Sequence, residues 1–205
     1  MCKICGSLTK NIAINKIKYE FCESCCFLCK TQEYILPPHD EFQRYLHHNN
    51  SDNEDYLKYQ EKFFNEIHSF LGAKVLDYGC GANHILVDIL IRNNFDANYY
   101  DLYFYPNENY EKHLYDAIIL EEVIEQLIQP MDVLTKLVSL LSKGGKIIIR
   151  TNLIPQNILD GKWWYLRDTT HISFFDIKTF EAICNLLPLS IIYCNDKDLI
   201  IFEKE

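Results

Sequence analysis

The chain has 205 residues, of which 48% are hydrophobic and 24% charged, a composition typical of one folded domain with a small appendage. Its formal net charge is −9, and because an acidic chain repels phosphate backbones, nucleic acid is not the partner we expect. No stretch reaches the ~18 apolar residues of a membrane span and the first residues lack a secretory segment, so we expect a cytoplasmic protein with no membrane partner.

Nine cysteines are unevenly placed, and six of them fall within the first 29 residues. In a chain that stays reduced, clustered thiols favour a metal over disulfides. Two C-x2-C pairs, sixteen residues apart, have the spacing of a tetrahedral zinc site, and residues 12–14 and 17–21 between them are typical of two short strands. We therefore predict a zinc ribbon over residues 1–36. Its ligands are Cys2, Cys5, Cys22 and Cys25.

The second pair of ligands is ambiguous, because Cys26 and Cys29 repeat the same spacing. We favour Cys22 and Cys25, since Cys22 directly follows the second strand. Reduced cysteines without metal, or an iron–sulfur site, are the alternatives. An ion held by four thiolates has no open position for a substrate, so the predicted zinc is structural.

Residues 37–71 are interpreted as a linker followed by a helix. Two prolines and a polar run make residues 31–50 typical of a linker or loosely packed crossing segment. Apolar residues then recur at helical spacing from Glu54 to Leu71, and Gly72 ends the predicted helix.

Beyond residue 72 the chain alternates strand and helix. This alternation predicts an α/β fold with a largely parallel sheet covered by helices, and the last two strands predict an antiparallel hairpin at its edge. The predicted strands are 74–77, 97–101, 117–120, 146–150, 189–193 and 199–202, and the predicted helices are 85–93, 130–141 and 175–186.

A glycine loop, residues 77–83 (D-Y-G-C-G-A-N), follows the first of these strands, where nucleotide-like ligands bind in such folds. Gly79 and Gly81 allow a tight turn and a close approach of the backbone to a ligand. Asp101 ends the next strand, at a spacing suited to accepting hydrogen bonds from ribose hydroxyls. A nicotinamide dinucleotide fold is the alternative interpretation.

Here the chain resembles the class I S-adenosylmethionine-dependent methyltransferases. Residues 75–83 match their first motif, V-L-D-x-G-C-G-x-G, except that Asn83 stands at the last glycine position. Residues 115–127 resemble their fourth-strand motif, with Gln126 in place of the usual histidine, and residues 141–149 resemble their glycine turn into the fifth strand. The resemblance implies a Rossmann-like methyltransferase domain over 72–205 that binds S-adenosylmethionine. The implied binding residues are Asp77, Gly79, Cys80, Gly81, Asp101, Leu102, Leu120 and Glu121.

Two departures from this family affect the cofactor site. Because Asn tolerates positive φ, we expect the turn at Asn83 to survive. Only fifteen residues separate Asp101 from Ala117, too few for the helix and third strand usually found there. We therefore expect a reduced cover over the adenine, with contacts from Leu102, Tyr103 and backbone groups.

A subgroup of these enzymes, of unassigned substrate, shares the ribbon and a W-W-Y-x-x-D-x-T-H-x-x-F-F/Y segment, which residues 163–175 match. We predict His171 as the base that deprotonates a methyl acceptor and Asp168 as the group that orients it or polarises the acceptor. The three aromatic residues that open the segment are expected to wall the pocket. The alternative is that the tryptophans are core and that Asp168 and His171 cap the next helix.

Glu122 and Glu125 are three residues apart, a spacing that places two side chains on one helix face. Some quinol O-methyltransferases that resemble this chain hold a divalent ion with an E-x-x-E-H set. Gln126 replaces that histidine, so the resemblance predicts no ion here. We interpret the pair as solvated or cofactor-facing.

Two functions from different classes follow. The first is enzymatic: methyl transfer from S-adenosylmethionine to an O, N or C nucleophile of an unidentified small molecule. The second takes the departures at Asn83 and Gln126 as signs of a degenerate fold that serves as a non-catalytic binding or scaffold module through its ribbon.

Overall fold

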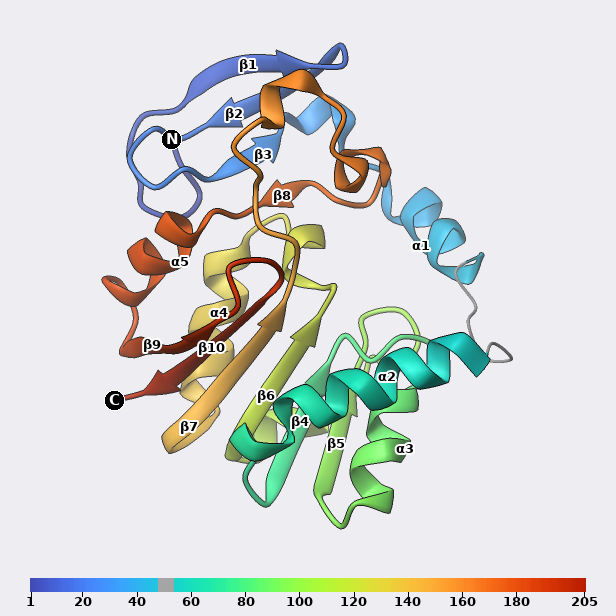
Figure 1. The fold of residues 1–205 in the computed structure, drawn as a ribbon. Coiled ribbons are helices and arrows are strands. Elements are labelled where there is room, and N and C mark those ends of the chain that lie inside the picture. Colours follow the sequence, from blue (N-terminus) through green and yellow to red (C-terminus); the bar gives the residue numbers. More distant parts are fainter. Residues whose placement is uncertain (48–53) are drawn as a thin grey trace.

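A computed structural model describes residues 1–47 and 54–205. Two sheets lie one above the other, with the N-terminal ribbon at one end and a larger, helix-covered sheet at the other (Figure 1). Among the described residues, no helix is both long and apolar enough to cross a membrane.

The larger sheet has six strands in the order β5-β4-β6-β7-β10-β9. The first four are parallel, because each is followed by a connection that returns across a face of the sheet, and β10 pairs antiparallel with both β7 and β9. The predicted α/β sheet with an antiparallel C-terminal edge is confirmed. The strands are β4 (Lys74–Tyr78), β5 (Asp96–Tyr100), β6 (Tyr115–Glu121), β7 (Leu141–Arg150), β9 (Leu189–Cys194) and β10 (Leu199–Lys204).

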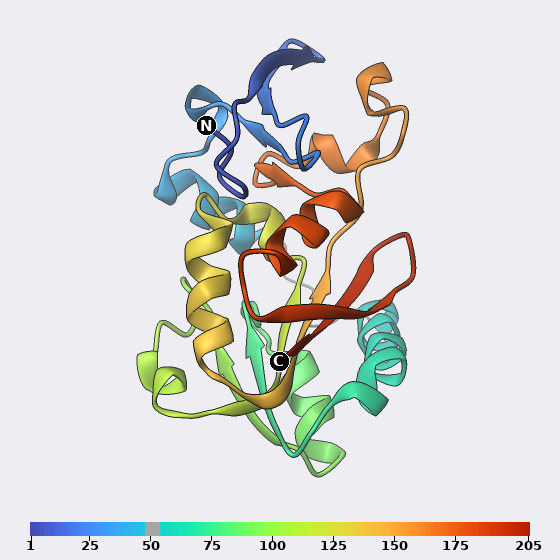
Figure 2. The same cartoon turned by 90° about the vertical axis from the view of Figure 1, so that its left-hand side faces the viewer.

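Helices cover both faces of this sheet, which Figure 2 shows edge-on. Helices α2 (Glu54–Ile67) and α3 (Ile85–Arg92) pack on one face, where Phe63 and Leu90 are fully buried. Helices α4 (Pro130–Ser139) and α5 (Ile177–Cys184) bury their apolar residues against the other face. The central strands β4, β6, β7 and β10 are apolar toward both sides, as expected for a sheet covered twice.

The ribbon is part of a second sheet, of order β1-β2-β3-β8. Its last strand, β8 (Ser173–Phe174), comes from the C-terminal half of the chain and pairs antiparallel with β3 (Leu28–Lys30). Predicted strands 12–14 and 17–21 correspond to β1 (Lys10–Ile14) and β2 (Ile17–Phe21). The ribbon therefore shares a sheet with the segment that carries His171.

Residues 31–50, predicted to be a linker, contain helix α1 (Pro38–Leu46). Pro38 begins this helix, at the position where a missing N–H costs nothing. None of its residues is buried, so it is joined to the rest of the chain by polar side chains and rings. Residues 48–50 of the predicted linker lie outside the described residues.

The connection from β5 to β6 is short, as the sequence predicts. Residues 101–114 hold one 3-10 turn and no strand of the larger sheet, so β5 is its edge. The 3-10 turns are η1 (Gln32–Tyr34), η2 (His68–Phe70), η3 (Glu108–Lys112), η4 (Ile124–Gln126), η5 (Ile158–Asp160) and η6 (Trp164–Arg167).

Candidate active site

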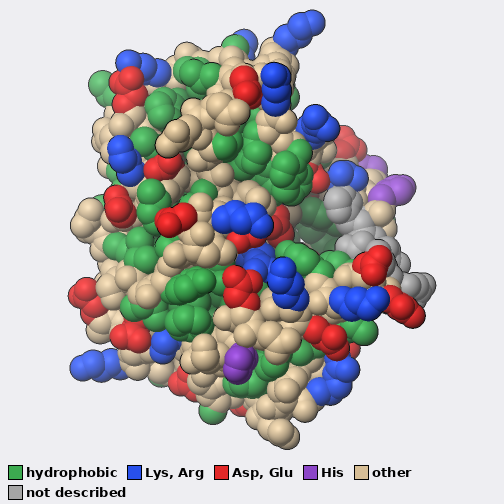
Figure 3. Space-filling view, viewed as in Figure 1, with side chains coloured by type: hydrophobic (Ala, Val, Ile, Leu, Met, Phe, Trp, Pro, Cys, Tyr) green, Lys and Arg blue, Asp and Glu red, His purple; other side chains and the backbone are tan. Residues whose placement is uncertain are grey.

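A cavity of about 640 Å³ lies at the carboxyl ends of β4, β5 and β6, where α/β folds bind ligands. Its volume falls within the roughly 300–1,000 Å³ of small-molecule sites. The molecular surface is hollowed between the two sheets (Figure 3). The glycine loop and residues 100–104 form one side of the cavity, and α1 with Trp164, Asp168, Thr170 and His171 forms the other.

Both glycines of the glycine loop have a positive φ, a conformation that favours glycine. Gly79 has φ +89°, and a Cβ there would come within 2.4 Å of the Val123 side chain. Gly81 has φ +66° and faces open space, which leaves room for a ligand beside the backbone. The turn is kept with Asn83 in place, but without a positive φ at Asn83: the left-handed residue is His84, with φ +35°, which stands directly before α3.

Asp101 holds the loops around the cavity together. Its Oδ2 accepts a hydrogen bond from the Gly81 N–H at 3.0 Å, and its Oδ1 accepts from the N–H groups of Tyr103 and Phe104 at 2.9 and 3.0 Å. A carboxylate has about four acceptor positions. Three are thus used to shape the loops, and one remains for a ligand hydroxyl.

A smaller cavity of about 90 Å³ adjoins the first and is lined by Asp77, Glu121 and Gln60. Glu121 Oε2 accepts a hydrogen bond from Gln60 Nε2 at 2.8 Å. Glu121 Oε1 and Gln60 Oε1 are buried and have no hydrogen-bond partner among the described residues. Burial raises the pKa of Glu121 to about 7 and, helped by the charges of Glu121 and Asp101, raises the pKa of Asp77 well above its usual range. The cavity is rich in acceptors, so it suits a cationic donor.

Of the predicted cofactor residues, Asp77, Gly79, Cys80, Gly81, Asp101, Leu102 and Glu121 line these two cavities. The Leu120 side chain does not, because it is fully buried in the apolar core. Successive side chains of a strand point to opposite faces, so Leu120 and Glu121 cannot both face the ligand.

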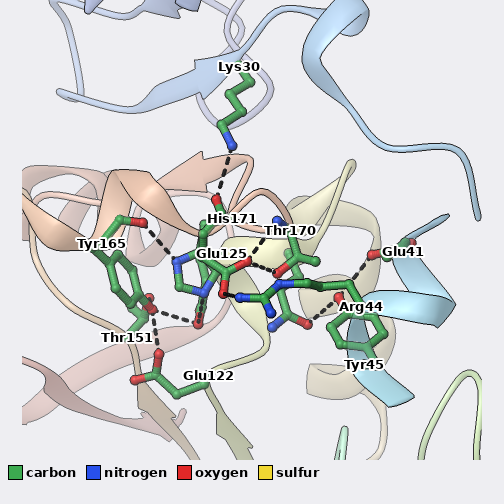
Figure 4. Close-up of polar contacts among 12 residues, drawn as sticks. Lys30, Glu41, Arg44, Tyr45, Glu122, Glu125, Thr151, Tyr165, Thr170 and His171 are labelled. Carbon is green, nitrogen blue, oxygen red and sulfur yellow. Dashed lines mark hydrogen bonds and ion pairs between the residues drawn. The ribbon is translucent and has the colours of Figure 1, made fainter. Parts of the chain in front are cut away.

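The loop before β8 is held by charged groups. Asp168 Oδ1 accepts hydrogen bonds from the N–H and hydroxyl of Thr170, and its Oδ2 pairs with Arg44 of α1 at 3.2 Å. Burial opposes ionisation of Asp168, but the Thr170 bonds and the charges of His171 and Arg44 lower its pKa below the usual range. The Lys30 ammonium donates to the Asp168 carbonyl oxygen at 3.2 Å (Figure 4).

His171 lies in the wall of the main cavity with Glu122, in front of the fully buried Glu125. The Tyr165 hydroxyl lies 2.8 Å from Glu122 Oε2 and 2.6 Å from Glu125 Oε1 (Figure 4). Glu122 is not helical: its φ is +52°, and only the 3-10 turn η4 follows. Of the three aromatic residues that open the segment, Trp164 alone lines the cavity, whereas Trp163 and Tyr165 pack in the ribbon core.

The four predicted zinc ligands lie together in the ribbon. Their sulfur atoms are all within 4.8 Å of one another, with Cys2 Sγ 3.6 Å from Cys25 Sγ and Cys5 Sγ 3.5 Å from Cys22 Sγ. Cys26 and Cys29 lie outside this group. Four thiols at these distances fit one tetrahedral zinc ion.

A family profile described as a methyltransferase domain matches residues 42–191, well over half of the chain. The chain belongs to this methyltransferase-domain family.

Solved structures agree with the fold of this methyltransferase domain. An O-methyltransferase family protein from Burkholderia thailandensis is 13% identical, with a TM-score of 0.53 over 73% of this chain and 57% of its own. The protein TnmH is 12% identical, with a TM-score of 0.54 over 74% of this chain and 56% of its own. This chain thus spans little more than half the length of these proteins. No curated protein matches it.

Three contributors to the methyltransferase site were missed by sequence reasoning. Glu41 and Tyr45 line the cavity from α1, and Gln60 reaches the smaller cavity from α2. Gln60 is polar yet 2% exposed, on the apolar face that Phe63, Phe64 and Ile67 share. A polar glutamine on the apolar face of α2 was the sequence signal that could have identified Gln60 as a site residue. No comparable signal marked Glu41 and Tyr45 of α1.

Proposed function

We propose that this protein transfers a methyl group from S-adenosylmethionine to an O, N or C nucleophile of a small molecule. The observation that carries the proposal is the pair of adjoining cavities at the carboxyl ends of the parallel strands, with the glycine loop and Asp101 on one side and the His171 loop on the other. Methyl transfer needs its two reactants held side by side, away from water.

The residues present fit the cofactor. The unpartnered oxygens of Glu121 and Gln60, beside Asp77, suit the α-ammonium group of its methionine part. The remaining acceptor position of Asp101 suits a ribose hydroxyl, and Leu102 and Tyr103 lie where an adenine would need an apolar cover. When bound, the cofactor supplies a methyl group made electrophilic by its sulfonium sulfur.

The acceptor would lie on the far side of the main cavity. We propose that Trp164, 58% exposed, covers it and that His171 and Glu122 face its nucleophilic atom. Asp168 acts as a positioning residue, since its carboxylate ties the loop to α1 and to Thr170. Substitutions at Asp168 should therefore loosen the loop rather than remove a reacting group.

We also propose that the ribbon holds a structural zinc ion through Cys2, Cys5, Cys22 and Cys25. Four thiolates whose sulfur atoms lie within 4.8 Å of one another need a cation to balance their charge, and the ribbon is too small to fold through its own core. A zinc ion held by four thiolates would take no part in methyl transfer.

The test is isothermal titration of the protein with S-adenosylhomocysteine, the demethylated product of the cofactor. Micromolar binding is expected. Asp101→Ala should weaken it at least about tenfold, because a hydrogen bond to a charged group contributes about 1.5–3 kcal/mol. Asp96→Ala is the matched control: Asp96 begins strand β5, which Asp101 directly follows, and it pairs with Lys74 at the surface, so this variant should bind as the wild type does.

Well-folded protein that binds no S-adenosylhomocysteine would contradict the proposal and favour a non-catalytic module. Equal losses in both variants would mean that strand β5 has been disturbed rather than the cofactor site.

A further inference from the structure

Three side chains that could hold a metal ion meet behind the acceptor side of the main cavity. Glu122 and Glu125 follow β6, and His171 comes from the loop before β8, far along the chain. One ligand atom from each lies within 4.8 Å of the other two. We call Glu122, Glu125 and His171 the carboxylate–imidazole cluster; Figure 4 shows the three pointing toward one another.

The His171 ring has the orientation of a metal ligand. Its Nδ1 lies 3.1 Å from the carbonyl oxygen of Tyr165, and a carbonyl can only accept, so Nδ1 carries the proton. In the neutral ring Nε2 then carries the lone pair, and it faces Glu125 Oε1 at 4.0 Å. Metal-binding histidines are commonly fixed in this way, with the second nitrogen donating to a backbone carbonyl.

The carboxylates of Glu122 and Glu125 share one hydrogen-bond donor, the Tyr165 hydroxyl. The Tyr165 hydroxyl has one proton, yet it lies within hydrogen-bond distance of both Glu122 and Glu125. Glu125 is 0% exposed, and its Oε2 has no hydrogen-bond partner in the described part of the chain. A buried carboxyl group in this state stays ionised only where a positive charge lies beside it, and otherwise takes up a proton.

Within the described part of the chain, no ion pair joins the neighbouring Arg150 to Glu125. Arg150 pairs with Glu66 of α2 and lies 3.9 Å from Glu121, on the side of the smaller cavity.

The backbone of Glu122 is strained, which also indicates a functional site. A left-handed residue other than glycine costs of order 1–3 kcal/mol and is common at functional sites. The Glu122 N–H donates to the Arg150 carbonyl oxygen at 2.9 Å, which fixes that conformation.

The cluster is also open on one side. Glu122 and His171 line the main cavity, whereas Glu125 lies behind them. An ion held between the three would have its remaining coordination positions directed at the cavity, where the proposed acceptor lies. Two carboxylates and one imidazole are a hard-to-intermediate ligand set, suited to Mn²⁺, Mg²⁺ or Zn²⁺.

We propose that the carboxylate–imidazole cluster binds one divalent cation and that the acceptor is a hydroxyl compound whose oxygen approaches that cation. This inference rests on the proposed function and makes His171 an ion ligand in place of a base. In the reaction, the hydroxyl proton leaves to water and the oxygen lone pair forms the new bond to the methyl carbon. The carbon–sulfur bond breaks with its electron pair on sulfur, so the sulfonium becomes a neutral thioether.

The test is titration of the zinc-loaded protein with Mn²⁺, followed by electron paramagnetic resonance of the free ion. One saturable site per chain is expected. Glu122→Gln, Glu125→Gln and His171→Gln should each weaken it at least about tenfold. Glu41→Gln is the matched control, since this carboxylate lines the same cavity but accepts hydrogen bonds from Tyr45 and Tyr103. It should bind Mn²⁺ as the wild type does.

Calorimetry with S-adenosylhomocysteine, run on every variant, shows which ones are folded with an intact cofactor side. Protein that binds S-adenosylhomocysteine but no Mn²⁺ would overturn this inference alone, and so would Glu122→Gln and Glu125→Gln variants that bind Mn²⁺ unchanged. Failure of S-adenosylhomocysteine binding with Mn²⁺ binding intact would instead contradict the proposed function.

Discussion

At the scale of single residues, the Tyr165 hydroxyl joins the ribbon core to the candidate active site. Its ring is 0% exposed and packs with Trp163 and Phe174, while its oxygen reaches both Glu122 and Glu125. Removing that oxygen would take this donor from the buried Glu125 and from the half-buried Glu122.

We therefore expect Tyr165→Phe to lower the free energy of unfolding by about 1–3 kcal/mol, the cost of leaving a buried acceptor unsatisfied. Urea denaturation of the zinc-loaded protein, with no further divalent cation added, measures it. Tyr19→Phe is the control in the same core: burial alone raises the pKa of Tyr19 to about 12, with no carboxylate acting on it. Equal effects in the two variants would contradict the account of Tyr165.

The residues of the site that could be predicted from the sequence are those with a characteristic conformation or chemistry at a strand end. Gly79, Gly81 and Asp101 stand at fixed distances from a strand end, so their chemistry shows in the sequence. The proximity of His171 to Glu125 does not show in the sequence, because His171 reaches Glu125 through a loop whose path depends on the pairing of β8. Gln126, next to Glu125 in sequence, supplies no imidazole; the imidazole beside Glu125 is that of His171.

At the scale of elements, β8 links the two sheets. On one side it pairs with β3; on the other, Ile172 donates its N–H to the Glu125 carbonyl oxygen at 2.8 Å, and the Ser173 hydroxyl donates to the Leu127 carbonyl oxygen at 2.9 Å. The Thr179 hydroxyl of α5 donates to the Cys25 carbonyl oxygen, within the second C-x2-C pair. The ribbon thus braces the loop that carries His171.

Removing zinc with a chelator should therefore free the amides of residues 28–30 and 172–174 to exchange with deuterium, because β3 loses its support. Residues 115–121 of β6, at the centre of the larger sheet, should stay protected. Hydrogen exchange followed by mass spectrometry measures both. Cys25→Ser should reproduce the effect and Cys26→Ser should not, since Cys26 lies outside the four-sulfur group. Unchanged exchange at 172–174 after zinc loss would contradict the bracing role.

Elements with a strong pattern were predicted and short ones were not. The predicted strands 74–77 and 146–150 centre on buried apolar residues, Val75–Leu76 and Ile147–Ile149, and appear within β4 and β7. Strands β3 and β8 have three and two residues, too few for any period, and exist because they pair with each other. Helix α1 is amphipathic but has no buried residue, and the prolines at its start were interpreted as part of a linker.

At the scale of the whole molecule, three parts of the chain enclose one cavity. The larger sheet supplies the glycine loop, the ribbon supports the His171 loop, and α1 contacts both sides. Tyr103 donates to Glu41 beside the glycine loop, and Arg44 pairs with Asp168 of the His171 loop. Because no helix and strand separate β5 from β6, α1 provides part of the cover that such folds usually take from that region.

The central claim is that this enclosed cavity is a cofactor site. Crystals grown with S-adenosylhomocysteine test it most directly. We predict electron density in the main cavity, with a ribose hydroxyl at Asp101 and the ammonium group beside Glu121 and Gln60. Well-ordered crystals with this cavity empty at saturating ligand, or with the ligand bound elsewhere, would contradict the account.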